Sequence, residues 1–113
     1  MSQTAAAATI VRHHEIQFTA RRVSDGPECV FTVVLEQTLA QSTDADDQGR
    51  TAQEWIRRTL HGQVLDAVLG ASPSAENLAL HLYSGCADFV PALTAVQVSP
   101  EPGSWVTYRP DGR

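Results

Sequence analysis

The composition of the chain limits which of its side chains could carry out chemistry. All 8 basic residues are Arg and none is Lys, so the chain offers neither a Schiff-base amine nor an ammonium general base. Catalysis must therefore use His, Asp, Glu, Cys, Tyr or Arg. With 13 acidic residues the net charge is −5, which argues against nucleic-acid binding through a basic face.

The four histidines of the chain are spread along its length. His13 and His14 are adjacent on a predicted strand and so point to opposite faces, while His61 and His81 lie on predicted helices. Each is interpreted as an ordinary surface or packed histidine, and they are not expected to share a metal. The acidic stretch 41–49 is predicted to be a solvated loop, because it lacks the spacing and the closing Glu of an EF-hand calcium site.

Cys29 and Cys86 are the only cysteines. No signal-peptide core precedes them, and no apolar run approaches the roughly 20 residues that span a bilayer. We therefore expect a cytoplasmic protein that does not bind membranes and keeps its thiols reduced.

The candidate groups must be positioned by a small number of strands and helices. Residues 10–22 alternate between apolar and polar side chains, and residues 29–40 form a second alternating, β-branched stretch. The turn residues 24–27 join them into a predicted antiparallel hairpin. The apolar spacing of residues 51–70 predicts a helix, and a second helix is predicted from the N-cap Ser74, closed by a proline at position 91.

Two further strands are predicted at the end of the chain, over residues 93–99 and 104–108, with a turn between them. The order ββααββ indicates one α+β domain over residues 10–109, between a flexible N-terminal tail at 1–9 and a C-terminal tail at 110–113. It favours an antiparallel sheet with both helices on one face. The other face and both outer strand edges are then uncovered, so we expect a homo-oligomer.

Four stretches of the chain resemble one known family in the same order. The helix start PSAENLALHLYSGC from Pro73 is similar to Pro-Thr-x-Glu-Asn-(Leu/Ile)-Ala, and VQVSPEPGSWVTY from Val96 to Val-x-Val-x-Glu-Thr-Pro-x-Ser-Trp-Ala-x-Tyr. FTARRV from Phe18 resembles Phe-x-Ala-Ala-His-Arg-Leu, and PECVF from Pro27 lies where the family has His-Gly-His-Asn-Tyr. The chain thus resembles the 6-pyruvoyl- and 6-carboxytetrahydropterin synthases over nearly the whole domain.

The resemblance implies a tunnelling fold (T-fold), in which subunits join their strands into an oligomeric barrel, commonly as trimers stacked into hexamers. Family members hold a catalytic zinc with three histidines. Here the first of these positions falls on Arg21 or Arg22, and the other two fall on Pro27 and Cys29. One thiolate does not hold zinc and Arg repels a cation, so neither a metal nor another cofactor is expected.

Other catalytic positions of the family also differ. Its cysteine has no counterpart in residues 23–26, and its Asp-His pair falls, without a gap, on Leu65 and Asp66. The glutamate that anchors the pterin ring falls on Pro100, next to Glu101. Pterin synthesis by the family mechanism is therefore not expected.

Six residues remain as candidates for the site, and all but Asp66 have an alternative interpretation. The substrate-binding candidates are Arg21 and Arg22, and the catalytic candidates are Glu101, Asp66, Glu76 and Cys29. A guanidinium can hold a carboxylate or oxyanion where zinc once did, but it can also be a solvated charge at a strand end. Glu101 can be an exposed turn residue, Glu76 can serve only the helix dipole, and Cys29 can be a small buried side chain.

Two function classes follow from these residues. The first is a metal-independent enzyme that performs a cyclisation, elimination or related acid/base step on a small polar or heterocyclic metabolite. The Arg-only, Ala- and Asp-rich composition associates it with bacterial specialised metabolism. The alternative is a non-catalytic T-fold module that binds a ligand or joins an oligomer.

Overall fold

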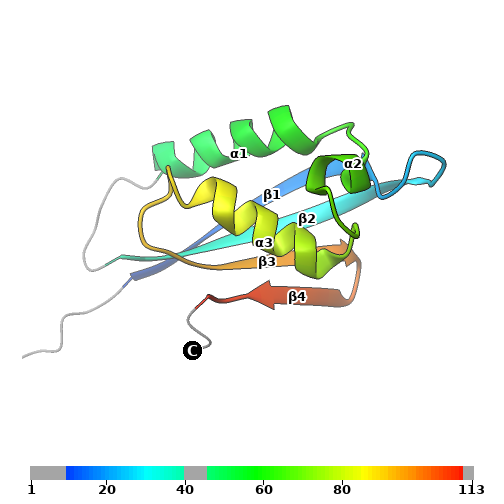
Figure 1. The fold of residues 1–113 in the computed structure, drawn as a ribbon. Coiled ribbons are helices and arrows are strands. Elements are labelled where there is room, and N and C mark those ends of the chain that lie inside the picture. Colours follow the sequence, from blue (N-terminus) through cyan, green and yellow to red (C-terminus); the bar gives the residue numbers. More distant parts are fainter. Residues whose placement is uncertain (1–9, 40–45, 111–113) are drawn as a thin grey trace, which may run out of the picture.

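The computed structural model describes residues 10–39 and 46–110, which form a four-stranded antiparallel sheet and three helices. The predicted tail at 1–9 lies outside these residues, as does the predicted tail at 110–113 except for residue 110. The strands β1 (Ile10–Arg21), β2 (Glu28–Leu39), β3 (Leu93–Glu101) and β4 (Ser104–Tyr108) follow the order β1-β2-β3-β4 across the sheet. The helices α1 (Asp46–Leu60), α2 (Leu65–Leu69) and α3 (Ala75–Cys86) all cover the same face (Figure 1). The α+β architecture and the antiparallel sheet are therefore confirmed.

The helix-covered face of the sheet carries the core, as the alternation in the sequence predicted. Phe18 of β1 lies across the sheet from Phe31 of β2, and their rings stack with centroids 5.2 Å apart. Apolar side chains from the helices close this layer, and burying them is the main favourable contribution to folding. The largest fully buried apolar side chains are Phe18, Phe31, Val33, Leu35, Ile56, Leu60, Leu65, Leu78, Leu82, Val90 and Val96.

The prediction of one helix over residues 51–70 is wrong. The helix begins earlier, at Asp46, and ends at Leu60, and α2 follows as a separate short helix. The break lies at Gly62, whose φ of 76° is left-handed and whose N–H donates to the Thr19 carbonyl at 2.7 Å. Tertiary pairing with the edge of β1 thus overrides the helical spacing. The loop predicted over 41–49 is wrong from residue 46 onward, and its first five residues lie outside the described part.

The second predicted helix is confirmed at its start. Ser74 is the N-cap, and its side chain accepts a hydrogen bond from the Asn77 N–H at 3.1 Å. The helix ends at Cys86 rather than running on to the proline, so Phe89 packs from the following turn. None of the described helices is long and apolar enough to cross a membrane.

The last hairpin differs from its prediction at Glu101. We predicted a turn over residues 100–103, but β3 continues to Glu101, which pairs with Ser104. The turn is therefore Pro102–Gly103, and Gly103 adopts a φ of 86°. This extension places Glu101 on the strand itself, at the end of the sheet where the β1–β2 hairpin also turns (Figure 1).

Candidate functional site

The end of β1 separates the two arginines that the sequence could not distinguish. Cys29 pairs with Ala20, a core residue, so Cys29 and Arg22 lie on the helix-covered side of the sheet. The Arg22 guanidinium carbon is 6.0 Å from the centre of the Phe31 ring, and its Nε is buried without a hydrogen-bond partner among the described residues. Arg22 is thus the arginine that shares a face with Cys29.

Arg21 points to the opposite side and has a structural partner. Its Nη1 donates to the Gly26 carbonyl at 2.6 Å, across the hairpin turn. Its own N–H donates to the Gln63 carbonyl at 3.0 Å, which fixes the segment before α2 against β1. Arg21 therefore stabilises the turn, and its side chain is exposed.

The remaining candidates near this end of the sheet are Cys29, Asp66 and Glu76. Cys29 is half-buried against the core, and its thiol lies 3.7 Å from the Pro27 carbonyl. The Asp66 N–H donates to the Arg22 carbonyl at 3.1 Å, while its carboxylate is exposed in the first turn of α2. Glu76 is exposed in the first turn of α3. Asp66 is therefore held beside Arg22 by a backbone contact.

This group of side chains does not fit a zinc ion. Zinc sites in proteins use three or four His, Cys or carboxylate ligands. In the part of the chain that the structure describes, no three such side chains gather in one place. Of the three positions where the family has zinc-binding histidines, only position 29 carries a possible ligand, the Cys29 thiol. The Arg22 guanidinium lies on the same face of the sheet, and its positive charge repels a cation. No step through a bound metal can be derived for this arrangement.

Glu101 instead lines a hollow of about 340 Å³ on the open face of the sheet. The walls of this hollow include two exposed apolar side chains, Val30 at 58% and Trp105 at 51% exposure. Its polar lining includes Thr32 on β2 and Ser99 on β3, which pair in the sheet. The Ser99 hydroxyl donates to the Glu101 backbone carbonyl at 2.7 Å, which fixes the strand end that carries the carboxylate.

The hollow offers two carboxylates, those of Glu101 and Glu15, an indole plane and two hydroxyl groups within one cavity. A carboxylate can accept two N–H bonds from the edge of an amino-substituted ring, and an indole can stack on the ring plane. Sequence reasoning identified Glu101 but missed Trp105, Thr32 and Ser99. Their polar-face positions could be read from the alternation, but the hollow depends on how three strands pair.

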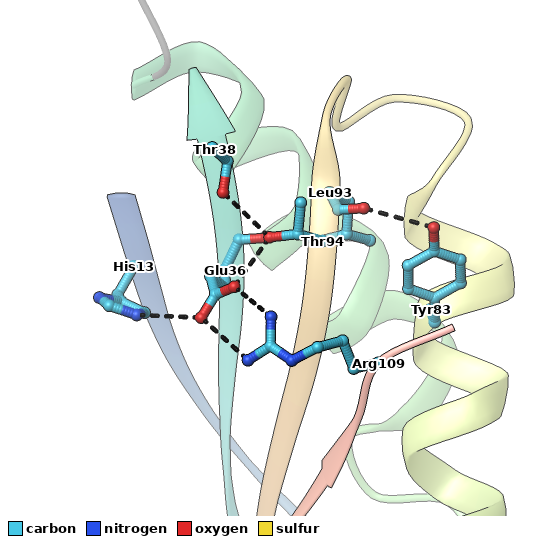
Figure 2. Close-up of polar contacts among 7 residues, drawn as sticks. All are labelled: His13, Glu36, Thr38, Tyr83, Leu93, Thr94 and Arg109. Atoms are coloured by element: carbon cyan, nitrogen blue, oxygen red, sulfur yellow. Dashed lines mark hydrogen bonds and ion pairs between the residues drawn. The ribbon is translucent and has the colours of Figure 1, made fainter. Parts of the chain in front are cut away.

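A second polar cluster on the open face, at the other end of the strands, was also missed. Figure 2 shows Glu36 of β2 receiving hydrogen bonds from Arg109 Nη1 at 2.8 Å and from the Thr94 hydroxyl at 2.9 Å. His13 Nε2 lies 3.7 Å from the other carboxylate oxygen. The hydrogen bond from Arg109 lowers the pKa of Glu36 most, and burial partly opposes it. Through these contacts Arg109, which follows β4, and Thr94 of β3 are both bound to Glu36 of β2. The cluster therefore stabilises the packing of these strands.

Comparisons with known proteins agree with this fold. The family profile described as 6-pyruvoyl tetrahydropterin synthase matches residues 6–111. The solved structure of Caenorhabditis elegans 6-pyruvoyl tetrahydropterin synthase is similar with a TM-score of 0.71, covering 90% of this chain and 94% of that one, at 13% sequence identity. At that identity the structural likeness shows the fold alone. No curated protein matches the chain.

Proposed function

Because the chain belongs to the 6-pyruvoyl tetrahydropterin synthase family, we propose that it is a lyase- or cyclase-type enzyme acting on a small amino-substituted heterocycle without a metal ion. The reaction would be a cyclisation, an elimination or a related acid/base step. We place the enzyme in the cytoplasm, where its two free cysteines would stay reduced.

The observation that carries this proposal is the open-face hollow that holds Glu101 beside Trp105. The Glu101 carboxylate would accept N–H bonds from the amino-substituted edge of the ring, and the Trp105 indole would cover the ring plane. Thr32 and Ser99 supply hydroxyl groups for further polar atoms of the substrate. Glu101 is then also placed to take up or release a proton at the bound ring edge.

The helix-side group would act from the opposite face of the sheet. Arg22 is the proposed carrier of positive charge where the family has a metal ligand, with Cys29 and Asp66 as acid/base candidates. Because Arg22 and Glu101 lie on opposite faces of one chain, a site that uses both takes its two halves from neighbouring subunits. This is the reason to propose a homo-oligomer, joined through the edge strands β1 and β4 of the sheet. The outer edge of β1 is already paired within the chain at Thr19 and Arg21, which hydrogen-bond to residues 61–63.

The binding part of the proposal is tested by isothermal titration calorimetry of the metal-depleted protein with 2-amino-4-oxopteridine. This is the pterin ring that appears in the names of the similar proteins. We expect saturable binding that Glu101→Gln weakens at least about tenfold, the effect of losing about 1.4 kcal/mol. Glu54→Gln, the same change on the exposed side of α1, is the matched control. Equal affinity of the Glu101→Gln and Glu54→Gln proteins would refute the assignment of Glu101.

Elemental analysis tests the metal-independent part. We expect no stoichiometric zinc, since the former triad positions now read Arg, Pro and Cys. About one zinc per chain that is lost on Cys29→Ala would overturn this expectation and restore a metal mechanism.

The second candidate function is a non-catalytic T-fold module that binds a ligand. The non-catalytic module is favoured by the distribution of the candidate residues over the chain. Glu101 and Arg22 lie on opposite faces of the sheet, and Glu76 is exposed. The two functions are separated by incubating the protein with a small-molecule extract and following substrate loss by mass spectrometry. An enzyme depletes a compound catalytically, and Arg22→Gln slows that loss more than Arg21→Gln. A module binds at most one equivalent per chain.

A further inference from the structure

The hollow that holds Glu101 is also lined by a second carboxylate, that of Glu15 on β1. The two side chains come from strands that are not neighbours, because Glu101 ends β3 and β2 lies between β1 and β3. Neighbouring strands of a sheet are about 4.8 Å apart, so β1 and β3 are roughly 10 Å apart across the sheet. The two carboxylates therefore border the hollow from different sides.

Neither carboxylate is neutralised by a basic side chain in the part of the chain that the structure describes. No Arg or His of that part lines the hollow, and its ion pairs do not include Glu15 or Glu101. His13 and Arg109, which lie on the same face of the sheet, contact Glu36 instead. The hollow thus carries two negative charges that remain available to a ligand.

The donor groups of the polar lining are directed at the protein itself. The Gln17 side chain donates to the Thr32 hydroxyl at 3.3 Å. The Ser99 hydroxyl is only 6% exposed and donates to the Glu101 backbone carbonyl at 2.7 Å. What the lining offers to a ligand is therefore mainly acceptors, namely the carboxylate oxygens and the Gln17 amide oxygen. A ligand that fits this hollow must supply N–H or O–H groups at both ends.

We propose that the substrate carries a second basic group, an amine or a guanidine, which Glu15 binds while Glu101 binds the amino-substituted edge of the ring. The inference rests on the function proposed above, which places that ring at Glu101. A protonated amine gives Glu15 a charge-assisted hydrogen bond, and the exposed indole of Trp105 attracts a cation over its face. An anionic substituent in the same place would be repelled by both carboxylates.

The test measures how the 6-aminomethyl, 6-hydroxymethyl and 6-carboxyl derivatives of 2-amino-4-oxopteridine bind to the metal-depleted, full-length protein by isothermal titration calorimetry. We expect the aminomethyl compound to bind about threefold or more tightly than the hydroxymethyl compound, and the carboxyl compound to bind most weakly. The preference should shrink as the salt concentration rises, because salt screens exposed charges. Equal affinities for the aminomethyl and hydroxymethyl compounds would overturn the proposal.

Substitution of Glu15 shows whether that carboxylate is the origin of the preference. Because the side chain is exposed, Glu15→Gln should leave the fold intact and keep the affinity for the hydroxymethyl compound within about twofold, while it abolishes the preference for the amine. Glu54→Gln removes the same charge from the exposed side of α1 and should retain the preference. A preference that persists in the Glu15→Gln protein would exclude Glu15 as the second binding group.

A probe without the ring separates this inference from the proposed function. 4-Aminobutylguanidine offers a planar N–H edge to one carboxylate and an ammonium group to the other. If the pteridines bind without a preference for the amine, the role of Glu15 is wrong and the proposed function stands. If no pteridine binds, but 4-aminobutylguanidine binds and is weakened by both Glu15→Gln and Glu101→Gln, the site for a dibasic ligand stands and the proposed function fails.

Discussion

The helix-covered face and the open face of the sheet differ in what their side chains contact. On the covered face Phe18, Phe31 and Val33 are at most 2% exposed, because three helices pack on them. On the open face Val30 and Trp105 are more than half exposed and border a hollow with polar groups. One face is occupied by the chain's own side chains, and the other is available to a ligand or to a second subunit.

Because of this difference, substitutions in the two groups of candidate residues are expected to have different consequences. Arg22 and Cys29 lie on the covered face, where one side chain approaches Phe31 and the other packs against the core. Their substitution therefore affects packing as well as chemistry. Glu101 lies on the open face, so its carboxylate can be changed with little effect on the core. The open face is where binding can be tested most cleanly.

The largest expected effect is on the free energy of unfolding. It is measured by making the Val→Ala substitution at two positions of β2, one on each face of the sheet. Val33→Ala should lower the free energy of unfolding by about 2–3 kcal/mol, because it removes two buried methyl groups and leaves a cavity. Val30→Ala should change it by less than about 0.5 kcal/mol. Urea denaturation of both proteins measures the difference. A comparable loss at Val30 would mean that the open face is buried in the assembled protein, and the contrast between the faces would not hold.

The next effect concerns the ion pair on the open face. Arg109→Gln should lower the free energy of unfolding at pH 7 by less than Val33→Ala does, because Glu36 loses a charged donor that is itself partly screened by solvent. The folded-state pKa of Glu36 lies below its ordinary value of 4.5, so this stability is present above pH 4.5 and is lost as the pH falls through the folded pKa. Denaturation between pH 3 and pH 7 should show the variant approaching the wild type in acid.

A control for this experiment is Arg58→Gln, which removes the same charge from an exposed position on α1. If Arg58→Gln and Arg109→Gln show the same dependence on pH, the effect arises from net charge. The ion pair with Glu36 would then contribute nothing measurable to the free energy of unfolding.

The smallest expected effect is a difference in thiol reactivity. Cys86 is fully buried in α3, and burial raises its pKa to about 12, whereas Cys29 is half-buried at the start of β2. A thiol reagent at pH 7.5 should label Cys29 at least about a hundredfold faster than Cys86, since the thiolate is the reacting form. Mass spectrometry should find one label in the native protein and two after denaturation. Rapid labelling of a Cys29→Ser protein would contradict this.

Much of the fold followed from local patterns in the sequence. Strict alternation in residues 10–22 and 29–40 assigned Ile16, Phe18 and Phe31 to one face, because side chains of a strand have a period of two. Ser74 marked the start of α3 through the chemistry of its hydroxyl. Such signals are contained in a few neighbouring residues, and they were sufficient for the four strands, the antiparallel sheet and the family resemblance.

Other features depended on contacts between residues far apart in the chain. The break between α1 and α2 arises because Gly62 hydrogen-bonds to Thr19, and helical periodicity within residues 51–70 carries no trace of that partner. The choice between Arg21 and Arg22 required the pairing of Ala20 with Cys29. The hollow that holds Glu101 joins side chains from β1, β2, β3 and β4. The sequence therefore determined the strands, the start of α3 and the buried faces. Only the tertiary structure decided where α1 ends and which charged groups share a cavity, because strand register and long-range hydrogen bonds set those distances.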